Sequence, residues 1–201
     1  PVPEDATPLI LSVGRLVENK RQHLLVEAMA ALKPLLQPEH ASPLLLLVGA
    51  TTNPAYEDAL RQRTREHNLE DVVWLTGRLT DATLRWLYQR ADLYWSASEH
   101  EGFCMPLLEA SHHKLPVIAM DSPGIADTTG AGALLLEDSN PCSLAATTAA
   151  VLASDRIREA MAIAGHENLA RFQRERLRDQ LAEYLASLGF VPIKMGRGAR
   201  L

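Results

Sequence analysis

Six short apolar runs recur along the chain, and longer, helix-like segments separate them. The runs cover residues 9–14, 44–49, 72–77, 93–98, 116–120 and 132–137. Each run is almost continuously hydrophobic, as expected of a strand that is buried on both faces. The pattern therefore predicts six strands of one sheet with helices on both sides.

The segments between the runs have helical character. They lie near residues 20–36, 56–67, 81–90 and 105–114, and two more follow the last run at about 141–153 and 155–187. Strands that alternate with helices indicate βαβ units and a parallel sheet. We therefore predict an α/β fold, a Rossmann-like open parallel sheet of six strands flanked by helices. This domain is expected at residues 9–188, after a linker at 1–8 and before a basic tail at 189–201.

The overall composition excludes several classes of protein. The chain has 201 residues, which suits one large domain, and a net charge of -5, which argues against general nucleic-acid binding. Its two cysteines form neither a disulfide framework nor a metal-ligand spacing, so a reduced, cytoplasmic setting is expected. No apolar run reaches the roughly 18 residues that span a bilayer. The linker-like start suggests a piece of a longer chain.

Ligands of an open parallel sheet bind beyond the carboxyl ends of its strands. After the first run come Gly14 and Arg15, and Lys20 and Arg21 then begin a helix behind Asn19, a suitable cap. Two cations oppose the dipole at a helix N-terminus, where an anion is favoured. Either an anion is bound there or the cations form a solvated turn, and the sequence leaves both interpretations open. Because Walker and G-x-G-x-x-G motifs are absent, P-loop hydrolysis and the standard dinucleotide site are disfavoured.

A second group of polar residues follows the fourth run, in the segment EGFCMPLLE at residues 101–109. Gly102 leaves room for the backbone to approach a ligand, and Pro106 suits the first position of a helix. Three amides are expected to point into the crevice beyond the strand, those of Phe103, Cys104 and Met105. They would form a second trap for an anion or a hydroxyl group.

Two glutamates enclose this segment. Glu101 comes directly after the strand, and Glu109 lies one turn into the helix, where its side chain leans back toward the same crevice. Carboxylates accept hydrogen bonds from vicinal hydroxyls, which a sugar or a ribose presents. A solvated Glu101 and a Glu109 that complements the helix dipole would explain each residue singly, but not the glycine and proline between them.

These segments together resemble retaining glycosyltransferases of the GT-B fold, close to family 4 (group 1). EGFCMPLLE is similar to the Glu-x7-Glu motif of that family, and VGRLVENK is similar to its Gly-Arg-Leu…Lys segment. Residues 72–98 resemble its Leu-Gly…Leu-Tyr…Ala-Asp stretch, and LPVIAMDSPG resembles the next strand and loop. The likeness covers roughly residues 9 to 185 and corresponds to the C-terminal, donor-binding domain.

The resemblance implies roles for individual residues. Arg15 and Lys20 are expected to bind the donor diphosphate and assist its departure, and Glu101 is expected to lie near the transferred sugar. Glu109 would bind the ribose hydroxyls. The donor-binding residues implied in this way are Gly14, Arg78, Leu79, Gly102, Phe103, Cys104, Met105 and Glu109, with Arg78 and Leu79 beside the base.

The sequence also departs from the family pattern. The loop after the fifth strand commonly carries Pro-Glu, and here Ala126 and Asp127 occupy those positions. Cys104 replaces the more frequent glycine. No base accompanies this cysteine, so we interpret it as a structural thiol and not as a nucleophile.

The resemblance implies transfer of a sugar from a UDP- or GDP-sugar to a glycan or lipid-linked acceptor, as in polysaccharide biosynthesis. No metal and no cofactor are expected. The expected partner is a missing N-terminal, acceptor-binding domain, through which peripheral membrane association can arise. Two alternatives stay open: another enzyme on this fold, such as a sugar-nucleotide epimerase or a phosphorylase, and a module that binds a nucleotide without transfer.

Overall fold

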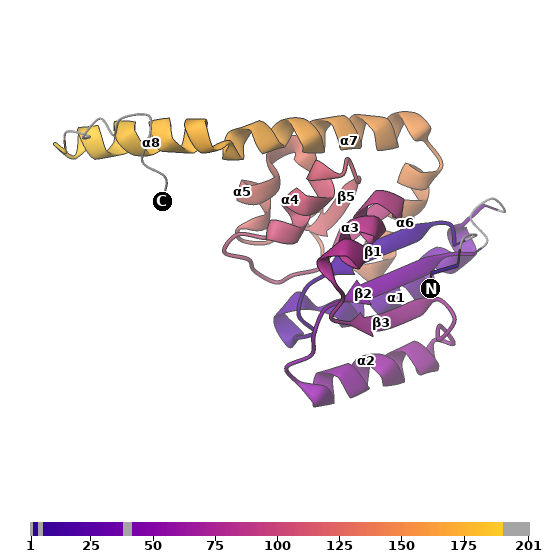
Figure 1. Cartoon of the computed structure of the whole chain (residues 1–201). Coiled ribbons are helices and arrows are strands. Elements are labelled where there is room, and N and C mark those ends of the chain that lie inside the picture. The colour runs from indigo at the N-terminus through magenta and orange to yellow at the C-terminus, as the bar shows by residue number, and fades with distance from the viewer. Residues whose placement is uncertain (1, 4–5, 38–41, 191–201) are drawn as a thin grey trace. The chain divides into compact units, whose positions relative to one another are not determined.

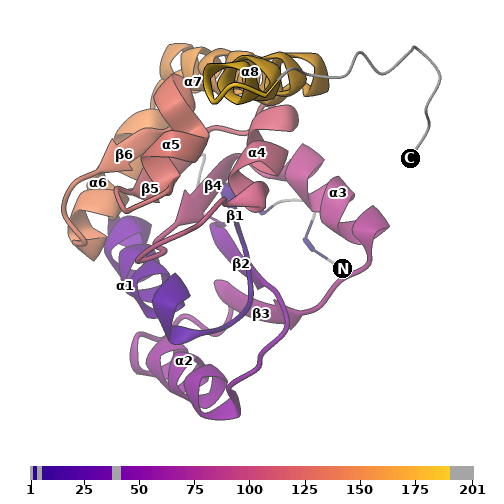
Figure 2. The same ribbon diagram turned by 90° about the vertical axis from the view of Figure 1, so that its left-hand side faces the viewer.

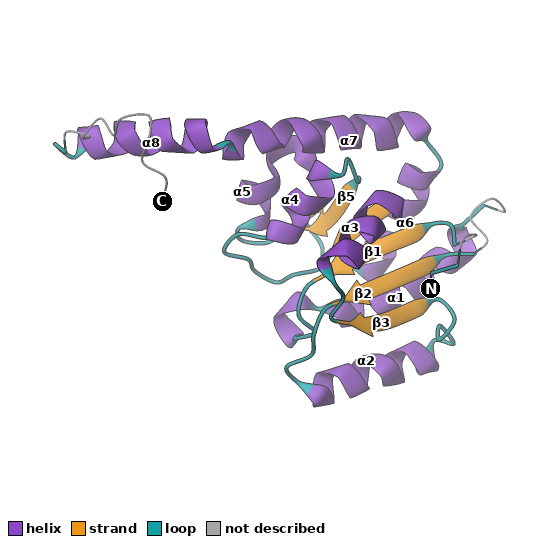
Figure 3. Ribbon diagram, in the orientation of Figure 1, coloured by secondary structure: helices purple, strands orange, loops and turns teal. Residues whose placement is uncertain are grey.

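The predicted α/β sheet is present in the computed structural model, which describes residues 2–3, 6–37 and 42–190. Six parallel strands form one sheet in the order β3-β2-β1-β4-β5-β6 (Figures 1 and 3). Each strand lies inside its predicted run and is one to three residues shorter. The strands are β1 (Leu9–Val13), β2 (Leu44–Val48), β3 (Val73–Gly77), β4 (Leu93–Ser96), β5 (Val117–Met120) and β6 (Leu134–Leu136).

Helices connect the strands and follow the last of them, largely where the sequence predicts them. They are α1 (Gln22–Leu32), α2 (Pro54–Glu66), α3 (Asp81–Arg90), α4 (Met105–His112), α5 (Ile125–Thr129), α6 (Pro141–Leu152) and α7 (Asp155–Asn168). The five-residue helix α5 was not expected. Helices α2 and α6 share one start signal, an asparagine cap followed by proline. The side chains of Asn53 and Asn140 accept backbone N–H groups of the first turn, as capping asparagines do.

The sheet separates two apolar cores, because neighbouring residues of a strand point to opposite faces. In β1, Ile10 packs into the core beneath α1, α2 and α6, whereas Leu9 and Leu11 pack into the core beneath α3, α4 and α5. All three side chains are fully buried. Figure 2 shows α1 and α6 on one side of the sheet and α3 and α4 on the other. Burial on both faces explains why the strands read as continuous apolar runs in the sequence.

The chain divides into two compact units, residues 1–168 and 169–201, whereas the sequence predicts one domain at residues 9–188. The predicted linker, residues 1–8, is partly anchored: Ala6 is buried, and the Thr7 N–H donates to the Ser42 carbonyl at 2.8 Å. Most of the predicted basic tail, from residue 191 onward, lies outside the described residues.

The single helix predicted over residues 155–187 is wrong. In the second unit, a 3-10 turn, η5 (Leu169–Phe172), precedes α8 (Arg174–Ser187). Gln173 has an extended backbone, with φ −64° and ψ 137°, so the helical hydrogen bonding is interrupted there. No residue of α8 is buried. Among the described residues, no helix combines the length and the apolar character needed to cross a bilayer.

A buried hydrogen bond between Trp95 and Thr148 lies in the core beneath α6. The Trp95 indole N–H on β4 donates to the Thr148 hydroxyl at 3.0 Å, and both residues are fully buried. Thr148→Val keeps the shape of the side chain and leaves the indole donor without its acceptor. We expect the free energy of unfolding to fall by about 1–3 kcal/mol.

Thr147→Val is the matched control, because Thr147 is the neighbouring, partly buried residue of the same helix. We expect it to change the free energy of unfolding by less than about 0.5 kcal/mol. Urea unfolding followed by tryptophan fluorescence measures both variants. Equal effects of the two substitutions would contradict the hydrogen-bond assignment.

Candidate active site

The candidate site lies where the strand order reverses, at the carboxyl ends of β1 and β4. These two strands are neighbours in the sheet although they are far apart in the sequence. The chain leaves β1 toward one edge of the sheet and β4 toward the other, so the loops that follow them separate and form a crevice. The segments that the sequence analysis selected, residues 14–21 and 97–109, are these loops.

Arg21 joins the two loops. Its Nε donates to the Ala97 carbonyl at 2.7 Å, and its Nη1 donates to the Ser139 hydroxyl at 3.0 Å. The Glu99 N–H donates to the Asn19 carbonyl at 2.8 Å and adds a second bridge. Arg21, in a left-handed conformation with φ 48°, is itself the N-cap of α1. The prediction that Asn19 caps this helix is therefore wrong, and the Arg21 guanidinium bonds to neighbouring loops, where the sequence left open a bound anion or a solvated turn.

Lys20 forms an ion pair with Glu101 across the crevice. The two side chains are 21% and 11% exposed. Burial raises the pKa of Glu101, but hydrogen bonds from the Lys20 and Ser98 side chains outweigh this effect and hold that pKa below its ordinary value. Glu101 is therefore ionised at neutral pH. The negative charge beside Lys20 in this structure is thus the Glu101 carboxylate.

The loop after β5 fixes the backbone of Glu101. The Glu101 N–H donates to the Pro123 carbonyl at 2.9 Å. Gly124 has φ 84°, and a Cβ at this position would overlap the Glu101 carbonyl. Only glycine combines this conformation with so close an approach. Sequence reasoning missed this role, although the Pro-Gly pair is a signal for such a turn. Asp127, the residue expected at the acidic position of this loop, lies on α5 and is exposed.

A small enclosed cavity of about 10 Å³ adjoins the Lys20–Glu101 pair, room for about one water molecule. Gly14 and Cys104 line this cavity. Burial, with the Glu101 charge, raises the pKa of Cys104 to about 12. The thiol is therefore protonated at neutral pH, which makes it a poor nucleophile and agrees with a structural role.

Gln22 lines the same cavity, and sequence reasoning did not single it out. Its side-chain amide donates to the Arg15 carbonyl at 2.8 Å and so fixes the turn after β1. Its Oε1 is buried and has no hydrogen-bond partner within the described chain. An amide in a helix start gives no sequence signal for such a role.

A second cavity, of about 380 Å³, lies at the carboxyl ends of β1, β2 and β3. It brings together four of the predicted site residues, Gly14, Arg15, Arg78 and Leu79. The side chains of Arg15 and Arg78 are exposed there. Two cations beside one cavity favour an anionic ligand.

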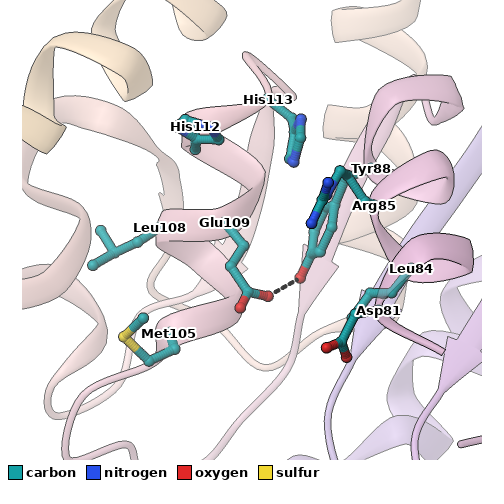
Figure 4. A pocket seen from close by; sticks show the side chains of 9 residues that line it. All are labelled: Asp81, Leu84, Arg85, Tyr88, Met105, Leu108, Glu109, His112 and His113. Carbon is teal, nitrogen blue, oxygen red and sulfur yellow. Dashed lines mark hydrogen bonds between the residues drawn. The ribbon is translucent and has the colours of Figure 1, made fainter. Parts of the chain in front are cut away.

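A third cavity, of about 420 Å³, lies between α3 and α4 (Figure 4). Glu109 and Met105 line it from α4, and Asp81 and Leu84 line both this cavity and the second one. The Glu109 carboxylate accepts a hydrogen bond of 2.8 Å from the Tyr88 hydroxyl. The second and third cavities thus adjoin along the start of α3.

The two glutamates of the motif do not share one cavity. Glu101 lines the small cavity beside Lys20, and Glu109 lines the cavity between α3 and α4, whereas the sequence analysis expected both carboxylates at one crevice. The reason is the rotation of the helix, which turns Glu109 toward α3. The Met105 amide donates to the Phe103 carbonyl at 3.0 Å and is not directed at a ligand. Gly102 and Phe103 are exposed and line none of the three cavities.

Metal-ligating side chains do not gather at these cavities. Within residues 2–3, 6–37 and 42–190, no group of three or more His, Cys, Asp or Glu side chains could hold a metal ion.

Comparison with known proteins supports the resemblance to group 1 glycosyltransferases. The family model described as "Glycosyl transferases group 1" matches residues 2–168. The D-inositol 3-phosphate glycosyltransferase of Kineococcus radiotolerans is 34% identical over 173 residues, which cover 80% of this chain and 39% of that protein. The GDP-mannose-dependent alpha-mannosyltransferase of Mycolicibacterium smegmatis is 30% identical over 155 residues, 76% of this chain and 36% of that protein.

A solved structure supports the fold. Anabaena Alr3699/HepE, in complex with UDP and glucose, has a TM-score of 0.76 and 24% identity to this chain, with 90% of this chain and 48% of that one covered. The chain thus spans less than half the length of each of these three proteins. Because the family model matches most of the sequence, the chain belongs to the group 1 glycosyltransferases.

Proposed function

We propose that this chain is the C-terminal, donor-binding half of a retaining glycosyltransferase that uses a UDP- or GDP-sugar. The observation that carries the proposal is the Lys20–Glu101 pair, a cation and a carboxylate fixed at the switch point of the sheet. Membership in the group 1 glycosyltransferases supports it. One relative is named for GDP-mannose and one structural neighbour contains UDP, so both nucleotides remain candidates.

The adjoining cavities suggest how the donor lies. The base would occupy the second cavity, beside Arg78 and Leu79, and the ribose hydroxyls would face Glu109. The diphosphate would then lie near Arg15 and Lys20, which neutralise its charge in the absence of a metal. The shared lining of the two larger cavities supports one continuous path for the nucleotide.

The mechanism follows from these charges. When the bond between the anomeric carbon and the diphosphate breaks, negative charge develops on the leaving oxygen, and the cations of Arg15 and Lys20 stabilise it. Lys20 would exchange its Glu101 partner for the diphosphate at this stage. The Cys104 thiol is protonated, which argues against a covalent intermediate on that residue. An acceptor hydroxyl would attack from the side that the diphosphate leaves, and its proton would pass to the departing diphosphate.

The acceptor belongs to the part of the protein that this chain lacks. The relatives named above are more than twice as long as the matched segment. We propose that the acceptor, a glycan or a lipid-linked sugar, binds an N-terminal domain in the cytoplasm, and that this domain provides any peripheral membrane association.

Removal of the Lys20 charge tests the diphosphate site. A charge-assisted contact contributes roughly 1.5–3 kcal/mol, so Lys20→Ala should weaken UDP or GDP binding about ten- to a hundredfold and leave nucleoside binding unchanged. Lys33→Ala, which removes an exposed lysine after α1, is the control and should bind like the original chain. Calorimetric titration measures the affinities, with EDTA and again with Mg²⁺. Equal losses for nucleoside and diphosphate, or a requirement for Mg²⁺, would contradict the assignment.

The two glutamates should differ in their effects. Glu109→Gln should weaken nucleoside diphosphate binding, because the ribose loses a charged acceptor. Glu101→Gln should not weaken it, because the loss of this carboxylate releases Lys20 for the diphosphate; it should instead impair recognition of the sugar. Titrations with the nucleoside diphosphate and with the nucleotide sugar separate the two variants. The reverse pattern would overturn the assignment of roles.

Transfer itself should require the rest of the protein. We expect the 201-residue chain to bind a nucleotide sugar weakly and not to transfer it, because half of the cleft is absent. Radiolabelled transfer from UDP- and GDP-sugars to a membrane-lipid or oligosaccharide extract is the assay, with this chain and with the longer protein. Transfer by the short chain alone would refute the need for a second domain, and failure of the longer protein with every donor would refute the proposed activity.

A further inference from the structure

Tyr88 of α3 is hydrogen-bonded to the glutamate of the third cavity. It belongs to the Leu-Tyr pair in the stretch of residues 72–98 that resembles the family. The residue is 3% exposed, and its hydroxyl donates to Glu109 Oε2 at 2.8 Å (Figure 4). The hydroxyl also lies 3.4 Å from the Pro106 carbonyl in the first turn of α4. One phenol thus connects α3 with both ends of the turn that carries Glu109.

The ring of Tyr88 packs against two other aromatic rings. It stacks on Tyr94 with ring centroids 6.2 Å apart and on His113 with centroids 5.6 Å apart, at interplanar angles of 17° and 10°. The Tyr94 hydroxyl is in turn within 3.1 Å of the N–H and the carbonyl of Val13, the last residue of β1. Burial raises the pKa of Tyr88 well above its ordinary value, so the hydroxyl remains a donor at neutral pH.

The hydrogen bond leaves one side of the Glu109 carboxylate available. Tyr88 donates to Oε2, and within the described residues no other side chain donates a hydrogen bond to this carboxylate. An ionised carboxylate accepts about four hydrogen bonds through its two oxygens, so three remain for other donors. Vicinal hydroxyls need two acceptor positions with a fixed separation, and a freely rotating carboxylate would lose entropy on binding them.

We propose that Tyr88 is a positioning residue that orients Glu109 for a vicinal diol and thereby sets the preference of this site for a ribose. This inference rests on the proposed function, in which Glu109 binds the ribose hydroxyls. It adds that the preference depends on a residue that does not itself contact the nucleotide. The hydroxyl of Tyr88 acts through Glu109, and its ring contributes only packing.

The test compares nucleotides that differ only in the diol. UDP and GDP are titrated calorimetrically against the chain beside 2′,3′-dideoxy-UDP and 2′,3′-dideoxy-GDP. We expect the original chain to prefer the ribonucleotide about tenfold or more, since the contact is charge-assisted. Tyr88→Phe should lose most of this preference through weaker binding of the ribonucleotide, with dideoxynucleotide binding unchanged. In the Glu109→Gln background, Tyr88→Phe should have no further effect.

Tyr56→Phe is the matched control, because the Tyr56 hydroxyl is partly buried and pairs with His23 on the other side of the sheet. It should keep the full preference. Should Tyr88→Phe fail to fold, Tyr88→Met replaces it: this side chain fills part of the same apolar space without a hydroxyl group, leaves Glu109 intact, and should lose the preference in the same way.

The outcomes separate the two hypotheses. If the original chain prefers the ribonucleotide and Glu109→Gln abolishes this preference while Tyr88→Phe retains it, the inference fails and the ribose assignment stands. The inference also fails if Tyr88→Phe weakens both nucleotides equally and adds to the effect of Glu109→Gln, because Tyr88 would then be merely structural. If the original chain shows no preference for the diol, the ribose assignment fails, and the inference with it.

Discussion

The adjacency of β1 and β4 is the constraint on which the candidate site depends. The two strands pair directly, with Ile10 opposite Leu93 and Leu11 opposite Tyr94. Because all six strands are parallel, their carboxyl ends meet at one edge, and the reversal of strand order leaves a crevice at this point. Two segments that are about 80 residues apart in the chain therefore become the two walls of one site.

Electrostatics then decides what this crevice can do. Lys20 from one wall and Glu101 from the other form an ion pair in a largely buried place. Burial of two charges is costly even when they are paired, so stability alone is a weak reason to keep such a pair. In the proposed function, this pair has another reason to be kept, because Lys20 exchanges Glu101 for the arriving diphosphate. Arg21 and Gly124 hold the two loops so that the charges meet.

The cavity between α3 and α4 depends on a different kind of interaction. Here the Glu109 carboxylate is held by a buried phenol instead of a cation. Its orientation derives from a stack of aromatic rings that extends through Tyr94 to the end of β1. The two glutamates of one short motif thus have separate environments. Such a difference in environment is what allows two identical side chains to take different roles.

The sequence by itself determined the fold class, since six continuous apolar runs separated by helical segments admit little else than a parallel sheet covered on both faces. It also determined the family, because the motifs are local and ordered along the chain. The helix caps at Asn53 and Asn140 are local signals too, because each asparagine lies directly before the helix that it begins.

Only the tertiary structure decided which of these residues meet. The Lys20–Glu101 pair, the structural role of Arg21 and the hydrogen bond between Tyr88 and Glu109 join residues that lie 21 to 118 positions apart. Such contacts depend on the order of the strands and on the rotation of each helix about its axis. Neither is encoded in a local pattern, because the same hydrophobic periodicity is compatible with several strand orders and helix rotations.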